Sequence, residues 1–267
     1  MGRRGVRLED EGKWVFNRLA GAYTHRPGYP DALVERLAAL AGGAGAAVAD
    51  LGAGTGHLAL PLARRGLRVS AVEPARAMLE ALARRAAEEG LRVQAVHGSA
   101  ELTGLASGAF GLVLWADAAH WVDPELAGRE AVRLVQASGV CAVVEAELGH
   151  TPFLDALREL IADANPRSRR PPRPSVTAQL LALSRPGADP VVERFEHEVT
   201  LGDDALEGTL RSLSYVGPAL APERVDALVG AARELSRRLG GAVWRRHLTL
   251  TWAGAEPART HRTDGTP

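Results

Sequence analysis

The sequence predicts an α/β fold: a doubly wound, seven-stranded and mostly parallel sheet with a final antiparallel strand, plus a helical lid or insertion. The apolar run at residues 48–51 is followed by Gly52, Gly54 and Gly56 and then by a leucine-rich segment that we expect to be helical. Apolar runs and helical segments alternate after it, and residues 243–252 alternate as a last strand. A strand, a glycine turn and a helix form the first unit of a nucleotide-type fold, whose ligands bind at the carboxyl ends of the strands.

Two helices are expected before the first strand. Apolar side chains recur at helical intervals over residues 14–23, and a second helix is expected at 31–40. The connector at residues 23–30 contains prolines that exclude one continuous helix. Residues 1–12 are polar, and we expect them to be loose.

The remaining elements follow from the same patterns. Further strands are expected at residues 68–72, 91–96, 110–114, 139–145 and 193–201, and helices at 75–89, 124–137, 152–164, 204–213 and 222–239. The chain therefore divides into N-terminal lid helices, a ligand-binding core, a helical and Pro/Arg-rich insertion over the pocket, the C-terminal part of the sheet and a disordered tail. Their bounds are 1–45, 46–150, 151–190, 191–252 and 253–267.

Composition excludes several classes of protein. The formal net charge is +0, so no general field attracts nucleic acid, and the arginine-rich stretch at 165–174 is expected to be a solvated loop. The one cysteine, Cys141, excludes an internal disulfide and lies in an apolar run, where we expect an inert thiol; the scattered histidines predict no metal site. Without a signal peptide or an apolar run of roughly 20 residues, we expect a cytoplasmic protein with no membrane partner.

The spacing of the glycine turn indicates the kind of ligand. A dinucleotide fingerprint would place its third glycine at position 57, where His57 stands, and no Gly-Lys-Ser/Thr sequence follows to hold phosphates. Asp50 lies two positions before Gly52. An acidic loop of this kind suits a ligand that lacks phosphates and carries positive charge, as S-adenosylmethionine does with its sulfonium and ammonium groups.

The stretch Asp-Leu-Gly-Ala-Gly-Thr-Gly at residues 50–56 resembles the class I S-adenosylmethionine-dependent methyltransferases, which have a Rossmann-like core. The phrase Arg-Pro-Gly-Tyr-Pro at 26–30, the pair His120-Trp121 and the phrase Ser-Tyr-Val at 214–216 are similar to a small-molecule subfamily that includes ubiquinone/menaquinone-type and trans-aconitate-type enzymes. The resemblance covers about residues 14–252. It implies that the connector folds over the cofactor; an ordinary helix connector is the alternative.

The resemblance also implies a set of cofactor contacts. Glu73 ends the second predicted strand, where a carboxylate can accept from both ribose hydroxyls of an adenosine. Ser99 stands near the adenine, where relatives often carry an aspartate, so we expect a weaker bond there. The expected cofactor-binding residues are Arg26, Asp50, Gly52, Ala53, Gly54, Gly56, Glu73, Pro74, Met78, Ser99, Ala100, Glu101 and Ala116.

Methyl transfer requires a base only when the acceptor must lose a proton. The candidate catalytic residues are His120, Asp117 and Tyr23, with His25, Glu145 and Glu147 as further candidates. Asp117 departs from the glutamine or asparagine that is commoner among the relatives, and His120 is equally plausible as a structural group. The motifs of nucleic-acid methyltransferases are absent, which favours a small organic acceptor, methylated at oxygen, nitrogen or carbon in a biosynthetic pathway. A cyclase that uses the same cofactor and a noncatalytic binding module are the alternatives.

Overall fold

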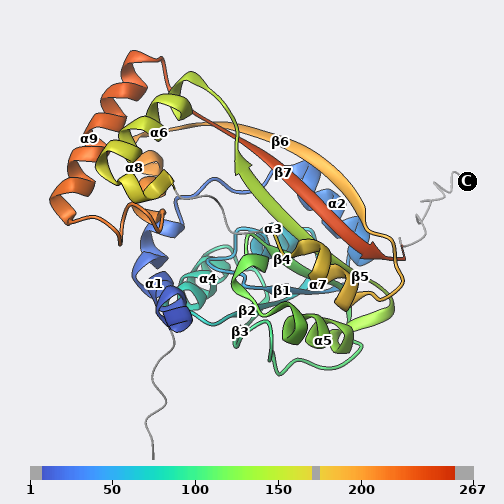
Figure 1. Cartoon of the computed structure of the whole chain (residues 1–267). Coiled ribbons are helices and arrows are strands. Elements are labelled where there is room, and N and C mark those ends of the chain that lie inside the picture. The colour runs from blue at the N-terminus through green and yellow to red at the C-terminus, as the bar shows by residue number, and fades with distance from the viewer. Residues whose placement is uncertain (1–7, 170–174, 256–267) are drawn as a thin grey trace, which may run out of the picture.

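The computed structural model describes residues 8–169 and 175–255, with side chains from residue 15 to 168 and from 175 to 255. It contains a seven-stranded sheet with the order β3-β2-β1-β4-β5-β7-β6 (Figure 1). The strands are β1 Ala47–Leu51, β2 Arg68–Glu73, β3 Val93–His97, β4 Phe110–Ala116, β5 Val135–Leu148, β6 Val191–Leu201 and β7 Ala242–Gly254. The first five pair in parallel, and β7 is antiparallel to both β5 and β6. The predicted fold class is therefore confirmed.

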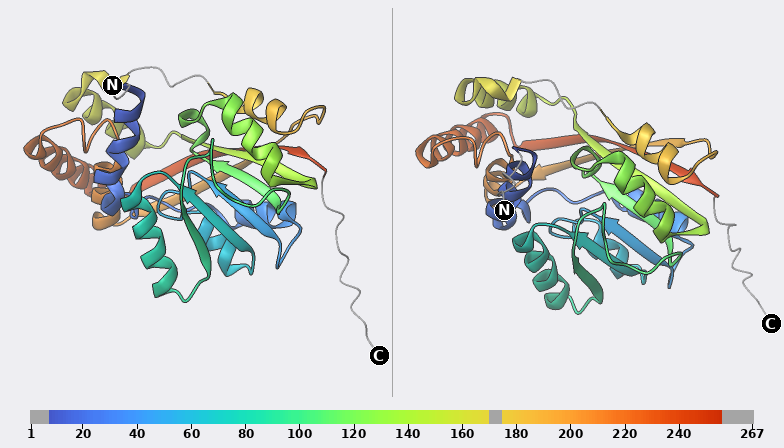
Figure 2. Two further views of the ribbon diagram at one scale, coloured as in Figure 1. Left: turned by 90° about the horizontal axis from the view of Figure 1, so that it is seen from below. Right: turned by 60° about the horizontal axis from the view of Figure 1, so that its bottom comes forward.

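Helices cover both faces of the parallel part of the sheet (Figures 1 and 2). The helices are α1 Leu8–Tyr23, α2 Asp31–Ala41, α3 Ala59–Arg64, α4 Arg76–Glu88, α5 Pro124–Leu134, α6 Pro152–Ala164, α7 Thr177–Ser184, α8 Asp203–Ser212 and α9 Pro222–Arg238, with short 3-10 helices η1 Ala119–Trp121 and η2 Pro166–Arg169. Alternate residues of β4 point to opposite faces, so Leu114 packs with α2 and α3 while Trp115 packs with α5 and α7. Both faces are thus buried, as the continuous apolar runs of the strands predict.

A second helical layer lies beyond the carboxyl ends of the strands. Strands β5 and β7 run past the parallel part of the sheet, and α1, α6, α8 and α9 gather at that end (Figures 1 and 2). Phe153, Leu206, Leu228 and Trp244 form a separate buried core there. The functional cavity lies between this layer and the glycine turn.

Several predicted bounds were wrong. Helix α1 begins at Leu8, so residues 8–12 are helical, not loose; residues 1–7 lie outside the described part. Helix α5 ends at Leu134 and not at residue 137, because the chain enters β5 directly at Val135. The pairing of β5 with β4 is irregular there, between Phe110 and Leu112. Helix α7 was not predicted, since it lacks a clear polar face.

Two further differences concern the start of α4 and the end of β7. Ala75, the first residue of the helix predicted at 75–89, is the N-cap of α4, which begins at Arg76. Strand β7 extends through Gly254, two residues into the predicted tail, of which residues 256–267 are outside the described part.

Two sequence expectations concern the interior and the membrane. Cys141 is fully buried, as predicted, and burial raises the pKa of its thiol to about 12. Among the described residues, no helix is long and apolar enough to cross a membrane.

Candidate functional site

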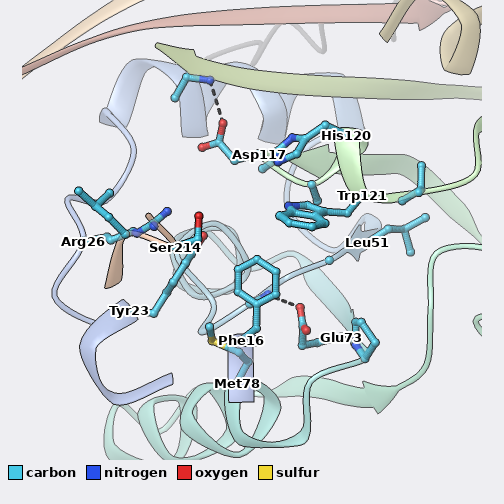
Figure 3. Close-up of a pocket in the computed structure, with 18 of the residues that line it drawn as sticks. Phe16, Tyr23, Arg26, Leu51, Glu73, Met78, Asp117, His120, Trp121 and Ser214 are labelled. Carbon is cyan, nitrogen blue, oxygen red and sulfur yellow. Dashed lines mark hydrogen bonds between the residues drawn. The ribbon is translucent and has the colours of Figure 1, made fainter. Parts of the chain in front are cut away.

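A cavity of about 370 Å³ opens at the carboxyl ends of β1, β2 and β4 (Figure 3). Its volume is within the range of roughly 300–1,000 Å³ that is usual for small-molecule sites. One end is lined by the glycine turn and by the loops after β2 and β3, and the other by β5, β7 and the segment around the end of α8. A smaller hollow of about 60 Å³ adjoins it beneath the connector between α1 and α2.

The glycine turn is tightly held and leaves no space for a side chain at Gly52. The N–H groups of Gly52 and Ala53 donate to the Val72 carbonyl at 2.8 and 3.1 Å. Gly52 has a φ of +81°, and a Cβ there would lie 2.6 Å from the Cβ of Ala118. Glycine is therefore required both for the left-handed backbone and for the close approach of the β4 loop.

Glu73 is held by two backbone donors at the end of β2. Its Oε2 accepts from the Gly54 N–H at 2.9 Å, and its Oε1 accepts from the Ala75 N–H at 2.8 Å. The residue is buried, and burial raises the pKa of the carboxyl group. Because each carboxylate oxygen has a second lone pair, the two oxygens can still accept from two ligand hydroxyls.

Asp50 is a buried carboxyl group with an unsatisfied oxygen. It is 2% exposed, it lines the smaller hollow, and its Oδ1 has no hydrogen-bond partner among the described residues. Burial, and secondarily the charge of Glu73, raise the pKa of Asp50 to about 7. A buried acceptor without a donor is costly.

Arg26 ties the connector to α8. Its Nε donates to Ser212 Oγ at 2.8 Å, one Nη donates to the Ser212 carbonyl at 2.9 Å, and the guanidinium lies 4.1 Å from the Tyr23 ring centre. It lines the cavity, and within the described part no carboxylate lies within 4 Å of it. Burial raises the pKa of Tyr23, although the charge of Arg26 acts in the opposite direction, so the Tyr23 hydroxyl is a hydrogen-bond donor near neutral pH.

Asp117 lines the cavity with both of its oxygens already engaged. Oδ1 accepts from the Ala146 N–H and Oδ2 from the Tyr29 hydroxyl, both at 2.8 Å. Its φ of +52° is in the left-handed region, and its N–H donates to the Val144 carbonyl at 2.8 Å. Asp117 therefore joins β4, β5 and the connector. This arrangement suits a positioning role better than proton abstraction.

An aromatic wall covers the cavity (Figure 3). The ring of Phe16 on α1 lies edge-on to Trp121 at 5.2 Å and to Tyr23 at 6.4 Å between centres. Asn17 Oδ1 accepts from the Ala77 N–H at 3.0 Å, which fixes α1 on the first turn of α4. His120 lines the same wall, with its ring 5.3 Å from that of Trp121. Helix α1 thus shields the site from water.

Most residues predicted for the site meet in this cavity. The residues that line it are Tyr23, Arg26, Gly52, Gly54, Glu73, Pro74, Met78, Ser99, Ala100, Glu101, Ala116, Asp117 and His120. Asp50 and Ala53 line the adjoining hollow. Gly56 lines neither, and its missing Cβ instead makes room for Leu82 and Leu60.

Several predicted residues lie elsewhere. His25, Glu145 and Glu147 do not line the cavity, and Glu145 accepts from Ser175. Within the described part of the insertion at 151–190, no residue lines it either. Helix α1 and the segment after α8 provide the cover instead, because α6 packs on α9 and β7 while α7 packs on α5.

The sequence prediction missed the far end of the cavity. The lining residues there are Leu148, Thr209, Leu213, Tyr215, Trp244 and Arg246. One signal was available in β7, where every second side chain points inward. These inward residues include Trp244, Arg246 and Leu248, so an arginine stands on an otherwise apolar face. Tyr29, the partner of Asp117, gave no such signal.

Known proteins resemble this chain in sequence and in fold. Residues 49–143 match the family model of a methyltransferase domain. Uncharacterised methyltransferases of Mycobacterium tuberculosis and Mycobacterium bovis are 40% identical over 130 residues, which is 48% of this chain and 51% of each relative. The chain therefore spans about half the length of the curated relatives it matches.

Solved structures share the whole fold. A protein assigned as a type II methyltransferase from Anaeromyxobacter dehalogenans has a TM-score of 0.62 and 25% identity, over 87% of this chain and 99% of that one. Phosphoethanolamine N-methyltransferase 2 of Haemonchus contortus, in complex with phosphomonomethylethanolamine and S-adenosylhomocysteine, has a TM-score of 0.54 and 16% identity, over 93% of this chain and 59% of that one. Geranyl diphosphate C-methyltransferase of Streptomyces coelicolor, in complex with Mg²⁺, geranyl diphosphate and S-adenosylhomocysteine, has a TM-score of 0.51 and 18% identity, over 94% and 98%. Residues 49–143 are thus similar to a methyltransferase domain, and the chain has the fold of the class I S-adenosylmethionine-dependent methyltransferases.

Proposed function

We propose that this protein transfers a methyl group from S-adenosylmethionine to a small organic molecule. The observation that carries the proposal is the arrangement of Glu73 and Asp50 around the glycine turn. One carboxylate is oriented with lone pairs to spare, and the other is buried with an unsatisfied oxygen. These are the acceptors that a ligand with vicinal hydroxyls and an ammonium group requires.

The residues of the cavity fit this cofactor from end to end. Glu73 would accept from the ribose hydroxyls, and Asp50 would accept from the ammonium group. Arg26, which lines both hollows and has no carboxylate within 4 Å in the described part, would hold the methionine carboxylate. Met78 and the loop at 99–101 would contact the adenine. Gly52 and Gly54 keep this path free of side chains.

The bound cofactor supplies an activated methyl group, so the protein contributes alignment and exclusion of water. Phe16 and Trp121 close the cavity above the glycine turn. Tyr23 stays protonated near neutral pH and Asp117 holds Tyr29, so neither suits a base. Where the acceptor must lose a proton, His120 is the candidate, because an imidazole can accept one near neutral pH.

The enclosed cavity supports an acceptor of small size. The neighbours with named acceptors also bind small molecules, phosphomonomethylethanolamine in one case and geranyl diphosphate in the other. The acceptor end is lined by β5, β7 and the α8–α9 segment, outside the matched domain at 49–143. Selectivity for the acceptor would therefore reside in the part of the chain that the family model does not cover.

Titration calorimetry with S-adenosylhomocysteine and with NAD tests the proposal. We expect the first to bind and the second not to. Glu73→Gln should weaken S-adenosylhomocysteine at least about tenfold, because it removes a charged acceptor, and hydrogen bonds to charged groups contribute about 1.5–3 kcal/mol each. Its amide nitrogen would also face a backbone N–H that it cannot accept from.

Glu88→Gln is the matched control. It makes the same change at an exposed carboxylate on α4, the helix that follows β2, and this variant should bind S-adenosylhomocysteine with the wild-type affinity. Incubation of the protein with adenosylmethionine carrying a deuterated methyl group and a metabolite extract should yield a labelled product by mass spectrometry. Binding of NAD alone would contradict the cofactor assignment. Tight binding of the cofactor without any labelled product would contradict the proposed transfer and indicate a binding module.

A further inference from the structure

We infer that the acceptor carries an oxyanion, a carboxylate or a phosphate monoester, which Arg246 binds at the far end of the cavity. The inference rests on the proposed function and assigns the acceptor's chemical class. In the sheet order β2-β1-β4-β5-β7, Arg246 lies four strand spacings from Glu73, roughly 19 Å. This spacing separates the two backbones, and the Arg246 side chain reaches back to line the smaller hollow beside the glycine turn as well.

The guanidinium of Arg246 is only partly satisfied by the protein. One Nη donates to the Gly28 carbonyl and to His197 Nδ1, the latter at 2.9 Å, and the group lies 5.5 Å from the Tyr29 ring centre. Its Nε is buried and has no acceptor in the described part of the chain. A buried N–H without a partner is costly in a native protein. Because this nitrogen has almost no accessible surface, a ligand would bind the outer nitrogens of the guanidinium and not Nε.

The charges around Arg246 do not neutralise it directly. No described carboxylate lies within 4 Å of it, and Asp117, whose charge acts on Arg246, is already bound by Tyr29 and by the Ala146 N–H. Burial and the charge of Arg246 itself lower the pKa of His197, so this neighbour is a neutral acceptor. Burial also lowers the pKa of Arg246, but an arginine remains charged at any ordinary pH.

The second cation of the cavity is already assigned. Arg26 and Arg246 both line the two hollows. Arg26, which Ser212 holds over the Tyr23 ring, would pair with the methionine carboxylate, and this leaves Arg246 for the acceptor. A partly buried charge without an ion pair destabilises the protein unless a partner joins it. An anionic acceptor provides that partner, whereas a cationic acceptor would be repelled.

The surroundings of Arg246 also define the body of the acceptor. Leu148, Leu213 and Trp244 line the same end of the cavity and are apolar. The geometry therefore indicates a small molecule with an apolar body and an oxyanion at one end. A purely structural role, holding the Gly28 carbonyl, would leave the cavity-facing position of this charge unexplained.

Calorimetry on protein saturated with S-adenosylhomocysteine tests the inference. The first titration, with S-adenosylhomocysteine alone, shows independently whether the cofactor site binds. The probes are acetate, butyrate, hexanoate and phenylacetate, each paired with its amide, and phenyl phosphate. In the wild type we expect at least one anion to bind about tenfold or more tightly than its neutral counterpart. The tighter of phenylacetate and phenyl phosphate identifies which oxyanion the site prefers.

Arg246→Met should abolish this preference while leaving the affinity for S-adenosylhomocysteine within about twofold. Arg246→Lys, which keeps the positive charge, should retain part of the preference for the anion. It replaces Arg246→Met in the test if the methionine variant fails to fold. The matched control is Arg245→Met, because the neighbouring Arg245 pairs with Glu198 outside the cavity. No anion preference in the wild type, or an undiminished one in Arg246→Met, overturns the inference and leaves the cofactor assignment intact. Loss of S-adenosylhomocysteine binding in Arg246→Met would overturn it by assigning Arg246 to the cofactor.

Discussion

Replacing Gly52 by alanine tests whether the turn after β1 needs glycine for its conformation, for its contact with the β4 loop, or for both. Gly52 and Gly45 have the same φ of +81°. An added Cβ at Gly45 meets no heavy atom within 4 Å, whereas at Gly52 it lies 2.6 Å from the Cβ of Ala118. Gly45→Ala is therefore a matched control that carries the backbone strain alone.

The two substitutions should differ in magnitude. A left-handed alanine costs about 1–2 kcal/mol, so Gly45→Ala should lower the free energy of unfolding by that amount. At Gly52 the new methyl is about 1 Å inside the usual carbon–carbon contact distance, and such overpacking costs about 1–3 kcal/mol more. Gly52→Ala should then lose about 2–5 kcal/mol in total.

Binding separates the two variants further. Ala118 is buried and directly follows Asp117, so a methyl at Gly52 pushes on the segment that lines the cavity. We expect the affinity for S-adenosylhomocysteine to fall in Gly52→Ala and to stay at the wild-type value in Gly45→Ala. Urea denaturation gives the free energies and calorimetry gives the affinities. Equal losses in both variants, with unchanged affinity, would refute the close-approach argument.

Two further predictions concern single groups of the site. Burial raises the pKa of the Asp50 carboxyl group from 3.8 to about 7 in the folded protein, so the wild type loses stability as the pH rises between these values. Asp50→Asn removes this loss. The variant should therefore be more stable than the ligand-free wild type above pH 7 and should gain nothing well below pH 3.8. Urea unfolding across this range measures the difference, and a variant with a pH profile parallel to the wild type would disprove the raised pKa. Tyr29→Phe should cost about 1.5–3 kcal/mol, since it removes a 2.8 Å hydrogen bond to the charged Asp117. Faster hydrogen exchange in the connector at residues 24–30 should accompany the loss, and unchanged exchange there would show that Asp117 does not hold this segment.

Local patterns were sufficient to predict the sheet and the cofactor end of the cavity. The strands near the glycine turn are continuous apolar runs that end in recognisable turns, and parallel strands bring their carboxyl ends to one edge. Glu73 and the loop at 99–101 could thus be assigned to the same pocket as Gly52, because each directly follows its strand. The positions of these contacts depend only on the short sequence around each strand end and on the order of the strands in the sheet.

The acceptor end depends on contacts between distant segments. Arg246 reaches the cavity only through the register of β7 against β5, where it pairs with Leu148. The hydrogen bond from Tyr29 to Asp117 spans 88 positions in the chain, and it is the reason that we propose a positioning role for Asp117 in place of a base. Helix α7 was missed for a different reason. Its sequence has no clear amphipathic pattern, and packing against α5 determines its helical structure.

A crystal structure of the protein with S-adenosylhomocysteine tests the central claim most directly. The account predicts the ribose hydroxyls on Glu73, the amino group beside Asp50 and the carboxylate on Arg26, with the sulfur facing the end of the cavity lined by Arg246. A ligand bound outside this cavity, or bound in it with its ribose away from Glu73, would contradict the account.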